Sequence, residues 1–517
     1  MRTGGKFGGS LWPYLRVTIV SAVCVWGIAE AGYGLMQVLG WRSSRHALFA
    51  LTGHFQNPGP FGGFIACVIA VAGAWVMGSP VKPGMTKERM GTKKMTTIVS
   101  VFAWAALGMG LLVLPASMSR AGWLGLAVAL GVEWMRSPIR SGMTKEGSGM
   151  PQPSRHAGQR SGIWWVAGVA LCLALLVGAF LLKPDSALGR LHVWRMECRA
   201  IAERPWTGAG PGMGPWAYGD AQEAFFREHL ETASAATIRV AGCPDYAYNE
   251  YLKIGVEYGI LVMVLFVLLV VSSIVVLHKA GSPLAAGLTA WAVFAFASYP
   301  LAVPQLRILG VVFIISGVIS GLLMIPNKVI AVVLAALVLV ATGWMGFASP
   351  MVGISHFARV AARSRRMTET GQRMTENGWR MMRKGDRERE EARAVYAEGY
   401  ALHLAGRYEE STRLLEKGAR MSCDPMFEII MGKNAEALGD CEKAAALYGK
   451  AHYMVPSRLY PLVRLMRLQI RQGQDAKALE TARQIVAMPV NGRNAGMVRL
   501  HEETQKTLDS LIVVTRR

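Results

Sequence analysis

Long apolar segments constrain the fold of this chain more than any other feature of its sequence. Up to residue 348, apolar residues gather into runs of roughly 17 to 25 residues, each long enough to cross a ~30 Å hydrocarbon layer as a helix. A composition that is 52% hydrophobic and 17% charged agrees with this. We predict an all-α, polytopic membrane protein with about nine transmembrane helices, at 15–40, 61–78, 97–115, 121–135, 163–182, 256–277, 284–303, 307–325 and 329–348. The segment 121–135 is the shortest of these and contains Glu133.

Lys and Arg are distributed unevenly among the loops. With a cytoplasmic N-terminus, the inner loops carry a net charge of +13 and the short outer loops +3. Because cytoplasmic loops are enriched in Lys and Arg, we predict that the large loop 183–255 and all residues after 349 lie outside. The overall charge of +22 then reflects topology and contact with anionic lipid. We expect membrane lipid as a partner, and no nucleic acid.

Seven cysteines occur in the chain. Cys198 and Cys243 bracket the large outer loop, so we predict that they could pair across it in an oxidising compartment. A helix of roughly 20 Å, at about 1.5 Å per residue, should separate Cys423 from Cys441. We expect no bond between those two cysteines.

An internal repeat follows the last apolar segment. Gly406, Gly439 and Gly473 recur at intervals of 33 and 34 residues, each followed by a helical pattern. The middle unit, LGDCEKAAALYGKAHYMVP, resembles the second helix of a tetratricopeptide repeat. We predict an α-solenoid of two or three stacked helix pairs that binds a protein partner; a plain helical cap over the membrane domain is the alternative. The predicted domains are 1–349 (membrane domain), 350–390 (basic linker or helix), 391–490 (tetratricopeptide-like repeats) and 491–517 (C-terminal tail).

Sequence signatures of common catalytic sites do not occur. We find no Walker loop, HExxH, GxSxG or CxxC motif, and no acidic pair with metal-ligand spacing. This argues against a nucleotide-driven pump or a metallohydrolase. We expect neither a metal nor a cofactor.

Polar residues gather at the outer ends of the apolar segments. TGHFQNPGPFGGFIA (52–66) places Asn57 in a turn-forming cluster, for which a helix-start turn is the simplest interpretation. PASMSRAGWLGL (115–126) places Arg120 in a very short outer turn, where its charge needs an anion or a carboxylate. A guanidinium suits phosphate oxygens. The alternative is that Arg120 extends to lipid headgroups.

The large outer loop begins with GRLHVWRMECRAIAERPWTGAGPGMG (189–214), which predicts an arginine-rich amphipathic helix ahead of a Gly-rich bend. A second amphipathic piece, DAQEAFFREHL (220–230), could lay Phe225 and Phe226 on the membrane surface. We expect these pieces to form a basic, aromatic vestibule for a lipid-linked phosphate. Its arginines are Arg190, Arg195, Arg199 and Arg204.

The stretch CPDYAYNEYLKIGVEYGI (243–260) closes the loop and begins an apolar segment. Asp245, Asn249 and Glu250 should lie at the outer interface, near the positive end of a helix. Capping of that helix by Asn249 or Asp245 is the simpler interpretation.

In this order, these segments resemble the O-antigen ligase and polymerase superfamily of bacterial envelope glycosyltransferases. The resemblance covers roughly residues 28–325 and rests on EAGYGLMQVLGW (30–41), FQNPGPFGGF (55–64), SRAGWLGL (119–126), GRLHVWRMECRAIAERPWTGAGPG (189–212), YNEYLKIGVEYGI (248–260) and SYPL (298–301). It implies a GT-C-like membrane fold in the bacterial inner membrane. It also implies transfer of a glycan from undecaprenyl diphosphate to an acceptor on the periplasmic face, without metal or nucleotide.

The resemblance also implies roles for single residues. By motif, Arg120 and Arg190 would hold the diphosphate, with Arg195 as a helper, because fixed arginines can stabilise the charge on a departing diphosphate. The acceptor hydroxyl needs a base. Many ligases carry a His immediately before the Asn of the last motif, where this chain has Tyr248.

Three residues are therefore candidates for the base. Glu250 is the first choice, Asp245 the second and His192 the third, since a helical setting also suits His192 for packing. Tyr248, Asn249 and Asn57 are expected to line the site.

Three acceptors fit this reaction: the lipid A core, the growing glycan, or Ser and Thr of a protein. The helical repeat favours a protein. Two alternatives come from other functional classes. A transporter of lipid-linked sugars predicts broken helices at mid-membrane and internal symmetry, and a non-catalytic assembly scaffold would use the repeats alone.

Overall fold

The computed structural model describes residues 7–46, 48–78, 90–142, 184–325, 387–489 and 494–515. These residues form helices joined by loops, and no named strand occurs among them. The chain divides into two compact units. Unit 1 takes its described residues from Met1–Pro184, Tyr248–Tyr251 and Met263–Trp344, and unit 2 from Asp185–Ala247, Leu252–Val262 and Met345–Arg517. The prediction of an all-α chain is confirmed for this part of the sequence.

Five of the described helices contain segments that are long and apolar enough to cross a membrane. The helices are α1 (Phe7–Val38), α2 (Pro58–Gly78), α3 (Met90–Val113), α10 (Ile260–Lys279) and α12 (Pro304–Met324). The expected segment 121–135 lies within α4 (Arg120–Gly142). The segments 163–182 and 329–348 lie outside the described residues. A helical membrane protein is thus supported, and the number nine stays a prediction.

Two predicted segments are divided. The segment 256–277 was expected to be one helix. The chain instead forms α9 (Glu250–Tyr258), which ends just after this segment begins, and then α10, with Gly259 between them. Gly259 has a φ of +87°, a conformation that favours glycine, and a Cβ there would lie 2.4 Å from the carbonyl oxygen of Trp206. Similarly, 284–303 is divided into α11 (Leu284–Phe296) and the short helix η3 (Pro300–Ala302).

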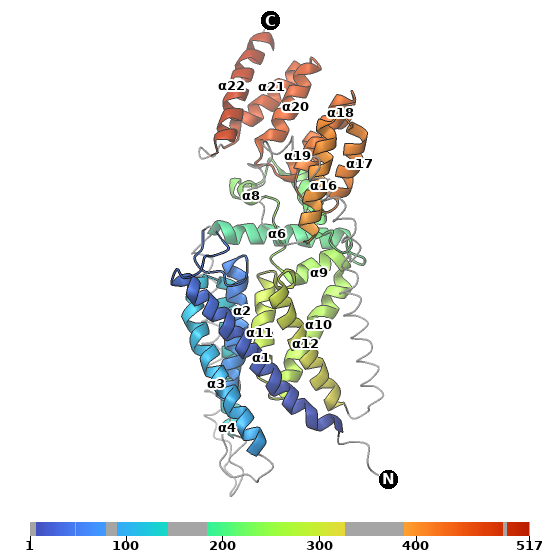
Figure 1. The fold of residues 1–517 in the computed structure, drawn as a ribbon. Helices are drawn as coiled ribbons and strands as arrows, with labels where there is room; N and C mark the ends of the chain where they lie inside the picture. The colour runs from blue at the N-terminus through green and yellow to red at the C-terminus, as the bar shows by residue number, and fades with distance from the viewer. Residues whose placement is uncertain are drawn as a thin grey trace, which may run out of the picture. The chain divides into compact units, whose positions relative to one another are not determined.

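Helix α2 is the centre of unit 1 and packs against α1, α3, α4 and α11 (Figure 1). Small residues allow this close approach. A Cβ on Gly62 would lie 2.4 Å from Oγ of Ser117, and one on Gly63 would lie 2.5 Å from the ring of Phe294. The paired glycines of the 55–64 motif are therefore required by packing.

Charged residues join three helices within unit 1. Glu133 of α4 lies 3.2 Å from Nδ1 of His278 and 3.6 Å from Arg136. Arg136 also donates to the carbonyl oxygen of His278 (2.7 Å), and Arg16 donates to that of Ala280 (2.9 Å). The first half of α1, the second half of α4 and the end of α10 thus meet on one side of the bundle, and Arg136 and His278 are the partners of Glu133 there.

Unit 2 begins with α6 (Pro184–Glu203), α7 (Gly214–His229) and α8 (Ala235–Val240). Among the described residues from 387 onward, seven helices follow, and each packs against the next (Figure 1). Gly406, Gly439 and Gly473 have positive φ values of 76°, 85° and 67° and end the first helix of each pair, as C-terminal glycines commonly do. The seven helices are α16 (Arg387–Leu404), α17 (Tyr408–Ala419), α18 (Met426–Ala437), α19 (Cys441–Met454), α20 (Leu459–Arg471), α21 (Asp475–Ala487) and α22 (Ala495–Thr515).

The middle pair, α18 and α19, explains the pattern of small and aromatic residues in the repeat. Ala444, Tyr448 and Ala451 are fully buried. A Cβ on Gly432 would lie 2.6 Å from the ring of Tyr448, whose hydroxyl donates to Glu436 (2.6 Å). Helix pairs are therefore observed, and their identity as tetratricopeptide repeats stays a prediction.

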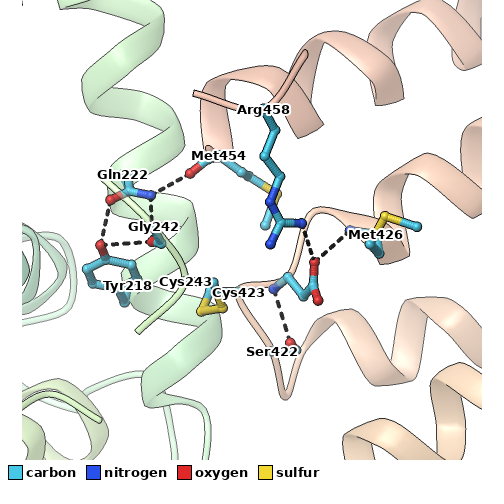
Figure 2. Close-up of a disulfide and its surroundings, with 10 residues drawn as sticks. Tyr218, Gln222, Gly242, Cys243, Ser422, Cys423, Met426, Met454 and Arg458 are labelled. Carbon is cyan, nitrogen blue, oxygen red and sulfur yellow. Dashed lines mark hydrogen bonds and ion pairs between the residues drawn. A yellow bond between two sulfur atoms is a disulfide. The ribbon is translucent and has the colours of Figure 1, made fainter. Parts of the chain in front are cut away.

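The predicted pairing of Cys198 with Cys243 is wrong. Cys243 is bonded to Cys423, with Cα atoms 5.4 Å apart, and Cys198 is free and exposed (Figure 2). The bond ties the end of the large loop to the segment before α18. The sequence did not indicate this disulfide, because its two cysteines lie 180 residues apart.

The expected exposure of two aromatic residues is also wrong. Phe225 and Phe226 of α7 are buried, in a cluster with Val193, Met196 and Cys423. Helix α7 packs against α19, so its apolar face is covered by protein within unit 2.

A buried side-chain amide links four parts of unit 2. Oε1 of Gln222 accepts from the hydroxyl of Tyr218 (2.5 Å) and lies 2.8 Å from Nε2 of His192. Its Nε2 donates to the carbonyl oxygens of Gly242 (3.1 Å) and of Met454 (Figure 2). All four hydrogen-bonding positions of the amide are thereby used. Gln222 holds the segment before Cys243 against α7 and α19.

Replacement of Cys243 or Cys423 by Ser should destabilise unit 2 by about 2–4 kcal/mol under oxidising conditions, because the unfolded chain loses a long cross-link. Thermal unfolding of the full chain, with and without reductant, measures this loss. Reduction should lower the melting temperature of the wild type and leave both variants unchanged. Cys198→Ser is the matched control and should behave as wild type; equal destabilisation by Cys198→Ser would contradict the assignment.

Candidate functional site

The candidate residues of unit 1 lie in two groups, and the first surrounds the start of α2. Oδ1 of Asn57 accepts from the backbone N–H of Gly59 (3.1 Å), so Asn57 forms the helix-start turn that the sequence favours. The carbonyl oxygen of Gly59 accepts from Oγ of Ser119 (2.8 Å). Arg120, the next residue, is the first residue of α4 and is half-buried. The structure thus places Arg120 beside the turn of Asn57.

The turn before Arg120 has a fixed local geometry. The chain leaves α3 through the short helix η2 (Pro115–Ser117), and Met118 follows with a positive φ of 48°. Oγ of Ser117 donates to the carbonyl oxygen of Leu114 (2.6 Å). These contacts reverse the chain within a few residues and determine where the first turn of α4 begins.

The second group, Tyr248 to Glu250, starts α9. Asn249 is buried, and its Oδ1 accepts from the backbone N–H of Tyr251 (3.0 Å), which confirms the capping interpretation for this residue. Glu250 is only 1% exposed, and its Oε1 accepts from the backbone N–H of Leu301 (2.8 Å). The first turn of α9 is therefore attached to η3.

Tyr248 has a φ of +54°, which is uncommon for a residue with a bulky side chain. Its ring meets that of Tyr299 edge-on, with centroids 5.9 Å apart. Nothing in the sequence pattern indicated this conformation. Strained backbone of this kind is frequent at functional sites, and here it directly precedes the cap of α9.

The remaining candidates belong to unit 2. Arg190, His192 and Arg195 share α6, and Asp245 is exposed in the loop after Cys243. The guanidinium of Arg195 lies 4.7 Å from the ring centroid of Phe225. Burial lowers the pKa of His192, and its Nε2 faces Gln222. His192 is therefore a buried member of the Gln222 network, and its burial favours the neutral form.

The Gly-rich bend has a role that the sequence did not reveal. Backbone N–H groups of Ala209 and Gly210 donate to the carbonyl oxygens of Val256 (2.7 Å) and Glu257 (3.0 Å). These carbonyls belong to the last turn of α9, where they have no partner within the helix. A Cβ on Gly208 would lie 2.5 Å from the backbone of Glu257, so the approach requires glycine.

A buried carboxyl was also missed. Glu197 of α6 is 4% exposed. Burial raises the pKa of its carboxyl to about 8; the charge of Glu257 adds to this rise, and Lys253 opposes it. Nζ of Lys253 lies 3.9 Å from Oε1 of Glu257. No group of three or more potential metal ligands occurs among the described residues.

Comparison with known proteins gives one family match. Residues 105–267 match the family model described as O-antigen ligase, and no curated protein matches the chain. The matched segment is 163 of the 517 residues. It contains Arg120, the large outer loop and the stretch 243–260. The match supports the O-antigen ligase superfamily and, with it, a glycan-transferring membrane enzyme of cell-envelope assembly.

Proposed function

We propose that this protein transfers a glycan from undecaprenyl diphosphate to an acceptor hydroxyl on the periplasmic face of the bacterial inner membrane. The observation that carries the proposal is Arg120, which lies in the family-matched segment and opens α4. The N-terminus of a helix carries a partial positive charge, which disfavours a cation there and favours an anion. Backbone N–H groups at such an end, with a guanidinium beside them, suit a diphosphate.

The resemblance adds Arg190 as a second diphosphate-binding residue, with Arg195 as a helper. In the proposed reaction, the acceptor oxygen forms a bond to the anomeric carbon while the bond from that carbon to the diphosphate oxygen breaks. The electron pair of the broken bond leaves on the diphosphate, where arginine charge stabilises it. The acceptor hydroxyl gives its proton to a general base, and the products are the glycosylated acceptor and undecaprenyl diphosphate.

The bond between Cys243 and Cys423 supports the proposed orientation. Disulfides persist in oxidising compartments such as the periplasm. Because both cysteines must be on one side of the membrane, the chain between them has to cross it an even number of times. In the predicted topology, α10, the segment 284–303 and α12 account for three crossings. The apolar segment 329–348, which lies outside the described residues, is predicted from the sequence to be the fourth.

The acid and base candidates have different surroundings. We propose that Glu250 positions the start of α9 through Leu301, and that Tyr248, Asn249 and Glu250 shape the acceptor side. Within unit 2, Asp245 is exposed, and His192 is engaged by Gln222. A network of this type suits a structural role for His192.

The acceptor is the lipid A core, the growing glycan or a protein. Helix pairs from α16 to α21 favour a protein acceptor or protein partner, since stacked pairs present a surface for peptides. A transporter is less favoured, because the break at Gly259 precedes an uninterrupted 20-residue α10 instead of dividing it.

Arg120→Ala and Arg190→Ala should each lower transfer by about 10²–10³-fold, the usual loss when a group that stabilises developing charge is removed. Surface glycan profiles and the amount of protein in the membrane measure this effect. Arg42→Ala, in an exposed outer loop, is the matched control and should leave transfer unchanged. Normal profiles in both test variants would refute the diphosphate site and favour a non-catalytic scaffold.

Glu250→Gln should retain most transfer, because the amide oxygen can still accept from Leu301. Glu250→Ala should lose it, because the buried N–H of Leu301 then lacks its acceptor. The same glycan profiles measure both. Loss of transfer in a stably inserted Glu250→Gln protein would instead assign Glu250 as the base.

Deletion of the gene should remove one class of glycoconjugate. Mass analysis of lipopolysaccharide and of periplasmic glycoproteins from the deletion strain identifies which one. Loss of glycan from lipid A core, shortened glycan chains, or unglycosylated proteins indicates a ligase, a polymerase or a protein glycosyltransferase, respectively. If every class is unchanged, the protein is not a glycan transferase.

A further inference from the structure

Helix α1 carries a buried carboxylate that the proposed reaction has not used. Glu30 is 6% exposed and lies within the apolar segment Tyr14–Val38. An ionisable residue in such a segment is costly unless it is paired, and it is a candidate functional residue for that reason. Its partner is His54, in the loop that precedes α2.

The two side chains form a directed pair. Nδ1 of His54 lies 3.2 Å from Oε1 and 3.1 Å from Oε2 of Glu30, and the backbone N–H of His54 donates to Oε2 (3.2 Å). The imidazole also stacks on Tyr33, with ring centroids 4.0 Å apart. The side chain of His54 is nevertheless 46% exposed. With Nδ1 directed at Glu30, Nε2 lies on the other side of the ring, and no described residue forms a hydrogen bond with it.

The loop that carries His54 is fixed to α1. Oε1 of Gln37 accepts from the backbone N–H groups of Thr52 (3.0 Å) and Gly53 (2.8 Å). Gly53 has a φ of +59°, and a Cβ there would lie 3.2 Å from Oε2 of Glu30. Nη1 of Arg45 donates to the carbonyl oxygen of His54 (2.6 Å). Tyr33 and Gln37 follow Glu30 at i+3 and i+7, so one face of α1 holds the loop.

The pair also lies close along the chain to the turn of Asn57 at the start of α2. Gly59 follows His54 by five positions in the chain, a stretch of at most about 18 Å. Gly59 accepts from Ser119, the neighbour of Arg120. All of these residues belong to unit 1.

We infer that His54 accepts the proton of the acceptor hydroxyl and that Glu30 is the residue that positions it; this inference rests on the proposed function. A carboxylate on Nδ1 holds the proton there, orients the ring and stabilises the imidazolium that forms, so that Nε2 can act as the base. As the bond from the acceptor oxygen to the anomeric carbon forms, the hydroxyl proton moves to Nε2. The electron pair of the broken bond leaves on the diphosphate. The imidazolium then releases its proton to water.

The competing explanation is a structural one, in which His54 only fastens the loop to α1. His54→Asn separates the two explanations, because an Asn amide can donate to Glu30 as Nδ1–H does but cannot take up a proton. The full chain, in vesicles of host membrane that contain the native acceptors, is supplied with undecaprenyl-diphosphate-linked oligosaccharide. Release of undecaprenyl diphosphate gives kcat and the KM for the donor.

His54→Asn should lower kcat by about 10²–10⁴-fold, with little change in KM for the donor. Glu30→Gln should lower kcat with little change in KM for the donor, because the imidazolium that forms loses its counter-charge. Glu30→Asp should recover part of kcat. Glu30 and Tyr33 of α1 are the described residues that contact the ring of His54. Arg45 donates to the backbone carbonyl oxygen of His54. His46→Asn, in that loop, is the matched control and should leave kcat unchanged.

Full activity of His54→Asn, while Arg120→Ala is inactive, would overturn the role of His54 and leave the proposed function intact. Full activity of Arg120→Ala and Arg190→Ala would overturn the proposed function itself. Equal loss in His54→Asn and His46→Asn would show that the loop is merely sensitive to substitution and would also overturn the inference.

Discussion

Helix ends at the edge of an apolar bundle must find partners for backbone groups that the helix itself cannot satisfy. Much of the candidate site consists of such partners. Asn57 turns the chain into α2, Ser119 joins the start of α4 to Gly59, and Asn249 caps α9. At the other end of α9, the Gly-rich bend supplies N–H groups to the last carbonyls. The motif residues thus have a structural role: they satisfy backbone groups at helix ends. In doing so, they fix the positions of the charged residues next to them.

Within unit 2, one side-chain amide and one disulfide hold the structure together in a comparable way. Gln222 and the Cys243–Cys423 bond hold the end of the large loop against α7 and the segment around α18 and α19. The helix pairs are therefore a packing partner of the loop, in addition to the binding role proposed for them. This arrangement explains why Phe225 and Phe226, apolar and periodic in the sequence, are covered by protein instead of lipid.

The sequence predicted what depends on local pattern. Apolar length indicated α1, α2, α3, α10 and α12, the recurring glycines marked the turns of the helix pairs, and Asn249 was a recognisable cap. It did not predict features that depend on distant contacts. The partner of Cys243, the break at Gly259 and the burial of Glu197 are set by residues remote in the chain. His54 was overlooked for the same reason, because its importance comes from Glu30, 24 residues earlier and inside an apolar segment.

The position of Cys423 also has a consequence for biogenesis. Its bond to Cys243 spans 180 residues, so the loop cannot be locked until the chain has been made as far as Cys423. Domains generally fold in order of synthesis, but in the proposed orientation this cross-link waits for export of the later segment and for an oxidant in the receiving compartment. In that orientation, a newly inserted membrane bundle would precede the completed protein, and the last step of maturation would depend on the oxidative folding machinery of the cell.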